Sequence, residues 1–515
     1  MRFKDLPKWL CVLSILVCML GCASLPSRDM IIPSYAIDAD KQSNLGDLVG
    51  YNHTDLSGFY PLADGVDAFV ARLALIESAQ HTIDVQYYLY HRQQTTKLFT
   101  AYLLAAAKRG VRVRLLLDDM SQADSAFDLG ALAHHPNFSV RLFNPFPNRS
   151  LPALGFITNF KLLSRRMHNK SFIVDNQVFI TGGRNMGNAY YAAEDHAEFI
   201  DLDVLAVGKI VPEASTAFDL YWNHELAYPI QSLRGESDDM ALQKVGDYLD
   251  NYVKQNHESN YVQRLRASNL VTMLGTGHLN LDWQKAEIFY DHPDKLLNEV
   301  EQRSANMSPH LFKAMGKPER KVIIVSPYFI PQDQGVNRLT EWVEQGVEVI
   351  VLTNSLAATD VAAVHAGYGH YRAALLRGGV KLWELKPSDL AALEIPNNKM
   401  RKTGSSQASL HAKTMTIDDS LIFVGSLNLD PRSFDLNTEM GVLVHSEKLS
   451  MMLSDWVDSK MDLFAWQLTL KSATEDKLLW HDTVTGETFD NEPQTSRWRR
   501  FQVWFMSLFP IEDAL

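Results

Sequence analysis

Cysteine is absent after residue 22 of this 515-residue chain, because all three cysteines (Cys11, Cys18 and Cys22) lie before that point. The rest of the chain therefore has no internal disulfide, no zinc–thiolate site and no cysteine nucleophile. A basic excess is also lacking, since 49 Lys and Arg stand against 61 Asp and Glu, a net charge of −12. Nucleic-acid-binding domains usually carry a basic excess, so we expect no nucleic-acid partner. A local basic site is not excluded.

The amino-terminal apolar run is short. Residues 9–20 form a nearly unbroken apolar stretch of 12 residues after three basic residues. A membrane-spanning helix needs about 20 such residues, so the run fits the apolar core of an export signal better. The small residues around Cys22 resemble a bacterial lipoprotein signal. The resemblance implies removal of residues 1–21 and lipidation of Cys22, and an uncleaved anchor helix is the alternative.

The same order of predicted elements occurs twice. Strand, helix and strand are predicted over 82–90, 97–108 and 111–117, and again over 321–330, 336–344 and 347–352. The glycines that end the two helices, Gly110 and Gly346, are separated by nearly the same shift as His168 and His411. A β-α-β unit implies parallel strands joined by a crossover. We therefore predict an α/β fold with two similar domains, each a mainly parallel sheet covered by helices, facing each other.

Composition divides the rest of the chain. The predicted units are a signal at 1–21, a tether at 22–52, a first domain at 53–240, a connecting helical region at 241–310, a second domain at 311–472 and a tail at 473–515. A helical projection of the tail separates one apolar face from two arginines and a serine. The apolar face consists of Trp498, Phe501, Phe505, Leu508 and Phe509, while Val503 and Met506 interrupt the polar face. The tail either lies in a membrane interface or packs against the body.

One motif occurs in two copies, HNKSFIVDNQVFITGGRN at 168–185 and HAKTMTIDDSLIFVGSLN at 411–428. The matched positions are His168 with His411, Lys170 with Lys413, Asp175 with Asp418, Gly182 with Gly425, Gly183 with Ser426 and Asn185 with Asn428. Chance does not explain six positions recurring at identical spacing. Each motif is predicted to begin on a strand, where residues two apart share a face, so one phosphate can contact both His and Lys.

These residue types suit phosphodiester chemistry. The lysines would neutralise the non-bridging oxygens, and Asn185 and Asn428 would add neutral donors. A neutral histidine can attack phosphorus while a protonated one donates to the departing alcohol. Two histidines in different protonation states perform both steps without a metal. We predict an enzyme that needs no metal and no organic cofactor.

The spacing His-x-Lys, four residues, Asp, six residues, Gly-Gly/Ser-x-Asn resembles that of the phospholipase D superfamily, and the likeness covers most of residues 60–470. Stretches such as DVQYYLY and LTNSLAATDVAAVHAGY are similar to the bacterial cardiolipin synthases of that superfamily. The resemblance implies His168 as nucleophile and His411 as proton shuttle. It further implies orienting carboxylates Asp203 and Glu439, and Asn185, Asn428, Ser426 and Gly183 as phosphate-binding positions. The motif aspartates Asp175 and Asp418 are expected to support the site rather than to carry protons.

The resemblance also implies a reaction, the ping-pong transfer of a phosphatidyl group to phosphatidylglycerol at a membrane surface, giving cardiolipin. It suggests phosphatidylethanolamine as the donor, and a small protein partner of unknown identity is left open. The alternatives are a phospholipase D with water as acceptor, a nuclease, which the acidic charge disfavours, and a non-catalytic lipid-binding scaffold, which two intact motifs disfavour. The signal places the chain in the bacterial envelope, on the periplasmic side. Ala23 and Ser24 lack the aspartate associated with inner-membrane retention, which favours the outer membrane.

Four further residues have weaker assignments. Arg184 and Arg432 either contact phosphate or pair with acids. A single histidine near tyrosines is more often structural than catalytic, and this applies to His365 and to His196.

Overall fold

The structure is a computed structural model. It describes residues 25–26, 31–38, 43, 45, 55–120, 128–147, 162–193, 197–275, 279–297, 306–387, 407–472 and 474–509. The predicted signal, Cys22 and most of the predicted tether lie outside these residues. Within the described residues, no helix has the length and apolar character needed to cross a bilayer.

The first half is built on a nine-stranded sheet with the order β10-β1-β8-β6-β5-β2-β3-β4-β9. Its strands are β1 (Ser57–Leu62), β2 (Thr82–Tyr87), β3 (Arg112–Asp118), β4 (Phe138–Phe143), β5 (Ser171–Val174), β6 (Val178–Gly182), β8 (Asp203–Gly208), β9 (Ala227–Pro229) and β10 (Asp282–Gln284). Its helices are α3 (Gly65–Ser78), α4 (Gln94–Lys108), α5 (Leu129–Leu132), α7 (Ile210–Trp222), α8 (Ile230–Arg234), α9 (Asp239–Asn256), α10 (Asn260–Arg266) and α11 (Asn269–Gly275), with a 3-10 turn η2 (Asn188–Tyr191).

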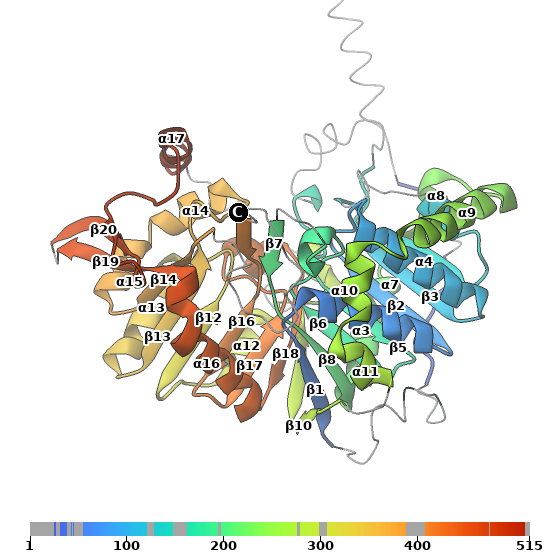
Figure 1. The fold of residues 1–515 in the computed structure, drawn as a ribbon, viewed down its shortest axis with the longest axis horizontal. Helices are drawn as coiled ribbons and strands as arrows, with labels where there is room; N and C mark the ends of the chain where they lie inside the picture. The colour runs from blue at the N-terminus through green and yellow to red at the C-terminus, as the bar shows by residue number, and fades with distance from the viewer. Residues whose placement is uncertain are drawn as a thin grey trace, which may run out of the picture.

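The second half repeats this plan on a ten-stranded sheet with the order β11-β18-β17-β16-β12-β13-β14-β19-β20-β21. Its strands are β11 (Ala286–Tyr290), β12 (Lys321–Val325), β13 (Glu348–Asn354), β14 (Lys381–Leu385), β16 (Thr414–Ile417), β17 (Leu421–Gly425), β18 (Met440–Val444), β19 (Ala465–Ser472), β20 (Glu475–His481) and β21 (Thr488–Phe489). Its helices are α12 (Ser308–Met315), α13 (Gln332–Glu344), α14 (Ala362–Gly369), α15 (Arg372–Arg377), α16 (Glu447–Phe464) and α17 (Arg497–Met506). Figure 1 shows the two halves side by side.

The α/β class and the two similar halves are confirmed. The β-α-β units form as predicted, and α4 and α13 end before Gly110 and Gly346, whose positive φ angles of 101° and 91° suit glycine. The expectation of mainly parallel sheets is wrong. In the first sheet only β2–β3 and β3–β4 pair in parallel, because the motif strands β5 and β6 form a tight hairpin, and a hairpin pairs antiparallel.

Three hydrophobic clusters place the halves relative to each other. One cluster joins the first sheet to its outer helices, and another joins the second sheet to α12–α15. The third contains side chains of both sheets together with α7 and α16, so it forms a shared core between the halves. The connecting region supplies an edge strand to each sheet, since β10 pairs with β1 and β11 with β18. The second sheet continues past residue 472 through β20 and β21.

Candidate active site

Two short backbone pairings join the halves where the motif histidines lie. The strand β7 (Ala197–Ile200) pairs in parallel with β15 (Gln407–Leu410), which leads directly into His411. Met167, which precedes His168, forms a parallel bridge with Thr438. The His411 amide donates to the Ile200 carbonyl at 2.8 Å, and the His168 amide donates to the Thr438 carbonyl at 2.9 Å. Each histidine is therefore fixed by backbone of the opposite half.

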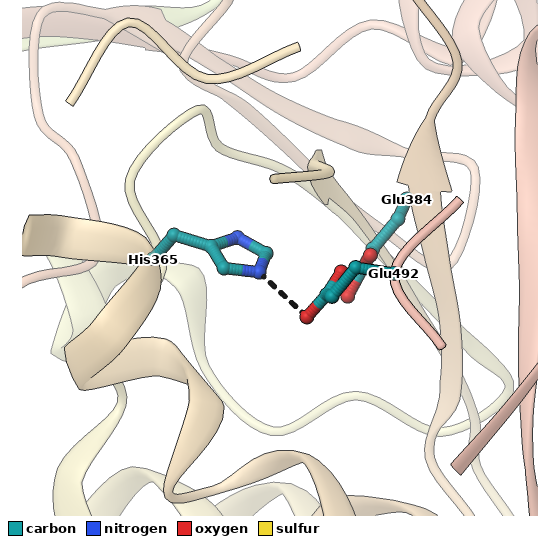
Figure 2. Close-up of side chains that lie close together, drawn as sticks. All are labelled: His365, Glu384 and Glu492. Atoms are coloured by element: carbon teal, nitrogen blue, oxygen red, sulfur yellow. Dashed lines mark hydrogen bonds and ion pairs between the residues drawn. The ribbon is translucent and has the colours of Figure 1, made fainter. Parts of the chain in front are cut away.

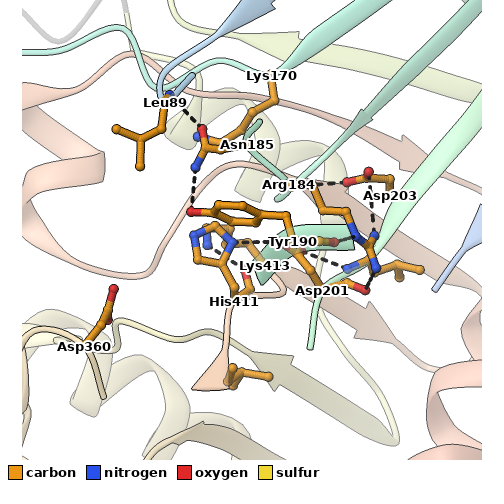
Figure 3. Close-up of polar contacts among 12 residues, drawn as sticks. Leu89, Lys170, Arg184, Asn185, Tyr190, Asp201, Asp203, Asp360, His411 and Lys413 are labelled. Atoms are coloured by element: carbon orange, nitrogen blue, oxygen red, sulfur yellow. Dashed lines mark hydrogen bonds and ion pairs between the residues drawn. The ribbon is translucent and has the colours of Figure 1, made fainter. Parts of the chain in front are cut away.

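The same crossing supplies each imidazole with a carboxylate. His168 Nδ1 lies 2.7 Å from Glu439 Oε2, and His411 Nδ1 lies 2.7 Å from Asp201 Oδ2. Figure 3 shows the His411–Asp201 contact and the residues around it. Both carboxylate side chains are fully buried. Because Nδ1 is held in this way, Nε2 of each ring is left for chemistry.

The assignment of Asp203 as an orienting carboxylate is wrong, and strand register explains why. The motif glycine Gly182 pairs with Asp203 between β6 and β8, and its counterpart Gly425 pairs with Gly441 between β17 and β18. The counterpart of Asp203 is thus Gly441, and two residues earlier stand the true pair, Asp201 and Glu439. Asp203 instead forms a buried ion pair with Arg72 at 2.7 Å.

The two motif lysines are arranged alike. Lys170 Nζ donates to the His168 carbonyl at 2.6 Å, and Lys413 Nζ donates to the His411 carbonyl at 2.5 Å. Burial lowers the pKa of Lys170 well below its usual value and lowers that of Lys413 to about 8. The nearby carboxylates, Glu439 for Lys170 and Asp201 for Lys413, oppose this shift. The site therefore holds two desolvated lysines, whose charged form a phosphate anion would stabilise.

Burial and the two lysines lower the pKa of both motif histidines, that of His168 to well below its ordinary value. Their carboxylate partners differ. Burial raises the pKa of Glu439 to about 7, so this carboxyl is only partly ionised near neutral pH. Burial acts in the same direction on Asp201, but the charge and hydrogen bond of His411 outweigh it and the pKa of Asp201 falls. Near neutral pH the carboxylate partner of His411 is therefore more fully ionised than that of His168.

The asparagines of the two motifs differ in their contacts. Asn185 Oδ1 accepts from the Leu89 amide at 3.1 Å, and Asn185 Nδ2 donates to the Tyr190 hydroxyl at 3.0 Å (Figure 3). Asn428 is buried, and among the described residues its Oδ1 has no hydrogen-bond partner. A buried amide oxygen without a partner is suited to a hydrogen-bond donor of a ligand.

Gly183 and Ser426 do not act as expected. Their amides bond to the adjoining backbone, Gly183 N to the Leu202 carbonyl and Ser426 N to the Met440 carbonyl. A Cβ on Gly183 would lie 2.2 Å from Asp201 Oδ1, so glycine is needed here to let Asp201 approach. At the matching position the Ser426 hydroxyl donates to Glu439 Oε2. Both positions serve the orienting carboxylates, and their assignment to phosphate is corrected accordingly.

Aromatic rings line the histidines. Tyr88 stands edge-on to His168 with ring centroids 5.1 Å apart, and Tyr190 stands edge-on to His411 at 5.0 Å. Phe199 also contacts His411, at 5.1 Å. These rings keep the imidazoles in place and reduce the access of water to them.

The motif aspartates lie at the opposite ends of their strands. Asp175 accepts hydrogen bonds from the amides of residues 80–82 at the start of β2. Asp418 accepts in the same way from the amides of residues 319–321 at the start of β12. Neither contacts a motif histidine. Both hold the start of a strand, away from the site that they were expected to support.

Three supporting residues were missed in the sequence. Asp118 Oδ2, at the end of β3, accepts from the Met167 amide at 3.0 Å. Asn354, at the matching end of β13, bonds to both backbone groups of Leu410. Asp291 accepts from the Glu439 amide at 2.8 Å. Polar residues just after predicted strands were the available signal for Asp118 and Asn354.

The remaining assignments resolve as follows. Arg184 donates to four backbone carbonyls and lies in the fold interior, which favours the structural role. Arg432 donates to the Ser164 carbonyl across the halves, and its charge lowers the pKa of His168. His365 is structural, and His196 lies outside the described residues.

His365, Glu384 and Glu492 form the one group of described residues close enough to share a metal ion (Figure 2). Arg372 Nη1 donates to Glu384 at 3.1 Å and to Glu492 at 2.8 Å, so a guanidinium already supplies the positive charge. We therefore interpret the group as an ion-pair network.

Comparison with known proteins shows the family of this chain. The family described as "Cardiolipin synthase, PLD-like domain" matches residues 73–222 and again 311–461. The chain belongs to this family of phospholipase D-like enzymes. It is 41% identical over 469 residues to cardiolipin synthase C of Escherichia coli K12, covering 90% of this chain and 97% of that one. An uncharacterised Helicobacter pylori protein is 30% identical over 434 residues, covering 83% of this chain and 85% of that one.

The fold is shared more widely. The crystal structure of phosphatidylserine synthase from Haemophilus influenzae superposes with a TM-score of 0.55 at 13% identity, covering 92% of this chain and all of that one. At that identity the likeness shows a common fold. In the family member described here, the two matched segments contain the two motifs, one in each half.

Proposed function

We propose that the chain is a phosphatidyltransferase that makes cardiolipin by moving a phosphatidyl group onto phosphatidylglycerol. The observation that carries this proposal is the pair of crossed contacts, His168 with Glu439 and His411 with Asp201, beside two buried lysines. The family membership and the similarity to cardiolipin synthase C support the choice of lipid as substrate.

His168 is the proposed nucleophile. Its low pKa keeps the imidazole neutral at physiological pH, and its Nδ1 is engaged by Glu439, so the Nε2 lone pair can face phosphorus. His411 is the proposed acid and base, since ionised Asp201 favours the protonated imidazole once a phosphate anion has entered.

The first step forms a bond between His168 Nε2 and phosphorus and breaks the bond to the donor's headgroup oxygen. His411 gives its proton to that oxygen, and the headgroup alcohol leaves. In the second step His411 takes the proton of the free glycerol hydroxyl of phosphatidylglycerol. That oxygen attacks phosphorus, the P–N bond breaks and His168 is regenerated. Phosphatidylethanolamine is the proposed donor.

Side chains would neutralise the negative charge of the phosphate oxygens. Lys170 and Lys413 would lie against the non-bridging oxygens, and Asn428 would add a neutral donor. Asn185 already uses one N–H for Tyr190, and an amide nitrogen carries two, so one is left for phosphate. The lysines supply the charge that a metal provides in other phosphodiesterases, so no metal enters the proposed mechanism.

The proposed location is the periplasmic side of the bacterial envelope, with a lipid on Cys22 and the outer membrane favoured. Replacing Cys22 by Ala should convert a protein that partitions into detergent into a soluble or unprocessed one. Unchanged partitioning and unchanged size would contradict the lipid anchor without touching the chemistry.

Two measurements test the reaction. Purified enzyme is given phosphatidylglycerol and phosphatidylethanolamine, and the products are identified by mass spectrometry. Cardiolipin with release of ethanolamine supports the proposal, whereas phosphatidic acid alone would show hydrolysis, because water competes for the same intermediate. Rapid quench with labelled phospholipid should trap an adduct on His168. An adduct on His411 would reverse the roles.

A further inference from the structure

Helix α17 turns its large aromatic side chains toward solvent and two of its arginines toward the protein. Its large exposed apolar side chains are Trp498, Phe501, Trp504 and Phe505, followed by Leu508 and Phe509 just beyond the helix, and their exposed fractions range from 48% to 64%. Arg497 and Gln502 are exposed as well. The half-buried side chains of the helix are Arg499, Arg500, Val503 and Met506. A surface helix normally turns its apolar side inward and its charges outward. Figure 1 shows α17 at the periphery, beside α14.

Specific contacts hold the helix in this orientation. Arg499 Nη2 donates to the Thr359 carbonyl at 2.8 Å, and Arg500 Nη1 donates to the Thr495 carbonyl at 3.1 Å. The segment leading into α17 is fixed by Glu492, whose carboxylate bonds to Arg372 and His365 in the ion-pair network of Figure 2. The helix also packs on α14. These contacts therefore keep the aromatic face of α17 exposed to solvent.

The aromatic residues form a continuous layer. Trp498 stacks on Phe501, Phe501 contacts Trp504 and Phe505, and Phe505 contacts Phe509, with ring centroids between 5.1 and 6.4 Å apart. Contiguous exposed apolar side chains of this kind mark an interaction surface.

The segment that anchors the helix adjoins the active site. Arg499 is anchored on Thr359, and the next residue, Asp360, accepts a hydrogen bond from the Tyr328 hydroxyl at 3.0 Å. The charge of Asp360 in turn acts on the pKa values of Tyr190 and Lys413, which belong to the site. Figure 3 shows Asp360 across from His411.

We infer that the outward face of α17 docks the enzyme on a lipid bilayer surface. Trp and Phe are the side chains that favour the interfacial layer, where their rings meet acyl chains. Arg497, the exposed arginine of this helix, can meet an anionic headgroup beside the aromatic face, while Arg499 and Arg500 hold the helix to the protein. A second copy of the chain fits less well, since six half-exposed side chains offer about 600 Å², below the roughly 800 Å² per partner of a stable interface.

We expect docking to bring the segment around Asp360, and with it the active site, close to the membrane, so that lipids reach the histidines from the bilayer. This consequence for turnover rests on the proposed function, whereas the docking itself rests on the geometry of α17.

The first experiment locates the helix. The full chain is mixed with phosphatidylglycerol vesicles whose acyl chains carry bromine, which quenches tryptophan fluorescence at short range. The reference variant Trp498→Phe/Trp504→Phe keeps the apolar face and removes the two reporters. We expect clearly stronger quenching of the wild type than of the reference. Equal quenching would overturn the inference, whatever the state of the amino terminus, because both proteins share it.

The second experiment measures the consequence. A variant with Ser at Trp498, Phe501, Trp504 and Phe505 is compared with a control carrying Ser at four exposed apolar positions elsewhere in the second half, namely Met451, Met452, Leu463 and Val484. We expect turnover on vesicles to fall on the order of a hundredfold in the α17 variant. Turnover on short-chain phosphatidylglycerol dispersed as monomers should stay unchanged, and so should both activities of the control.

The outcomes separate the two proposals. If no protein makes cardiolipin from either substrate while the quenching difference persists, the proposed function fails and the docking surface stands. Equal loss on vesicles and on monomers would show that α17 supports the fold, which overturns the inference. A dimer, seen by light scattering, that the α17 variant abolishes, together with equal quenching, would assign the surface to a second copy instead.

Discussion

Replacing Asp201 by Asn should cripple proton transfer while leaving the fold intact. The carboxylate lies 2.7 Å from His411 Nδ1, and both side chains are at least nine-tenths buried. At an effective dielectric constant of about 20, which also describes buried sites, such a charge pair is worth about 4 kcal/mol, which corresponds to about a thousandfold in rate. A general acid contributes roughly 10²–10⁴-fold, so a loss within that range is expected in kcat.

The pH dependence follows from the same contact. Donor cleavage needs protonated His411, and ionised Asp201 favours that form. The neutral amide removes this support, so the pKa of His411 falls further and adduct formation should decline at lower pH than in the wild type. The assay is rapid quench with labelled phospholipid over a series of pH values.

The matched control is Asp203→Asn, two residues along the chain. Asp203 pairs with Arg72 at 2.7 Å in the interior, so its replacement should cost about 3–5 kcal/mol of the free energy of unfolding. Turnover per folded molecule should stay within a few-fold of the wild type. The reverse pattern, with kcat lost in Asp203→Asn at unchanged stability and retained in Asp201→Asn, would refute the reasoning.

Four further outcomes are expected. Glu439→Gln should reduce kcat less than Asp201→Asn at pH 7, because burial raises the pKa of Glu439 to about 7. The loss of kcat relative to the wild type should grow as the pH rises, and a loss independent of pH between 6 and 9 would contradict this. Turnover should decline above pH 8, where Lys413, with a pKa of about 8, loses its charge, and a kcat/KM profile of Lys413→Gln should lack that limb. Asp175→Ala should lower the free energy of unfolding by about 1–3 kcal/mol in urea titrations without changing turnover per folded molecule, since its three acceptor contacts are all to backbone amides. Turnover should survive EDTA, and a loss restored by a divalent ion would show the lysines to be insufficient.

Local features of the site could be predicted because they depend on short spacing. The expectation that each motif begins on a strand is wrong, since β5 and β16 begin after the lysines, at Ser171 and Thr414, but the two copies still arrange His and Lys alike. The strand, helix and strand order was visible in apolar periodicity, and the glycines that end α4 and α13 were visible as breaks. These signals act within about 20 residues, where chain geometry alone decides the outcome.

The partners across the halves could not be predicted from spacing. The segment between Asn185 and Asp201 is longer than that between Asn428 and Glu439, so the spacing in one copy does not locate the carboxylate in the other. Only the pairing of Gly182 with Asp203 and of Gly425 with Gly441 aligns the two copies. The mainly antiparallel pairing of the strands was missed for a related reason. Apolar alternation within a strand does not show whether its neighbours run parallel or antiparallel to it.

The crossed carboxylates have a consequence for the inheritance of the enzyme. Each half carries one histidine and the carboxylate that serves the other half's histidine. A gene encoding a single half would yield a protein with an unserved imidazole, which could work only by assembling with a copy of itself. Once fused, the halves are free to diverge in sequence but not to separate, because a chain damaged in one half also disables the chemistry of the other. Selection therefore acts on the two crossed histidine–carboxylate pairs together.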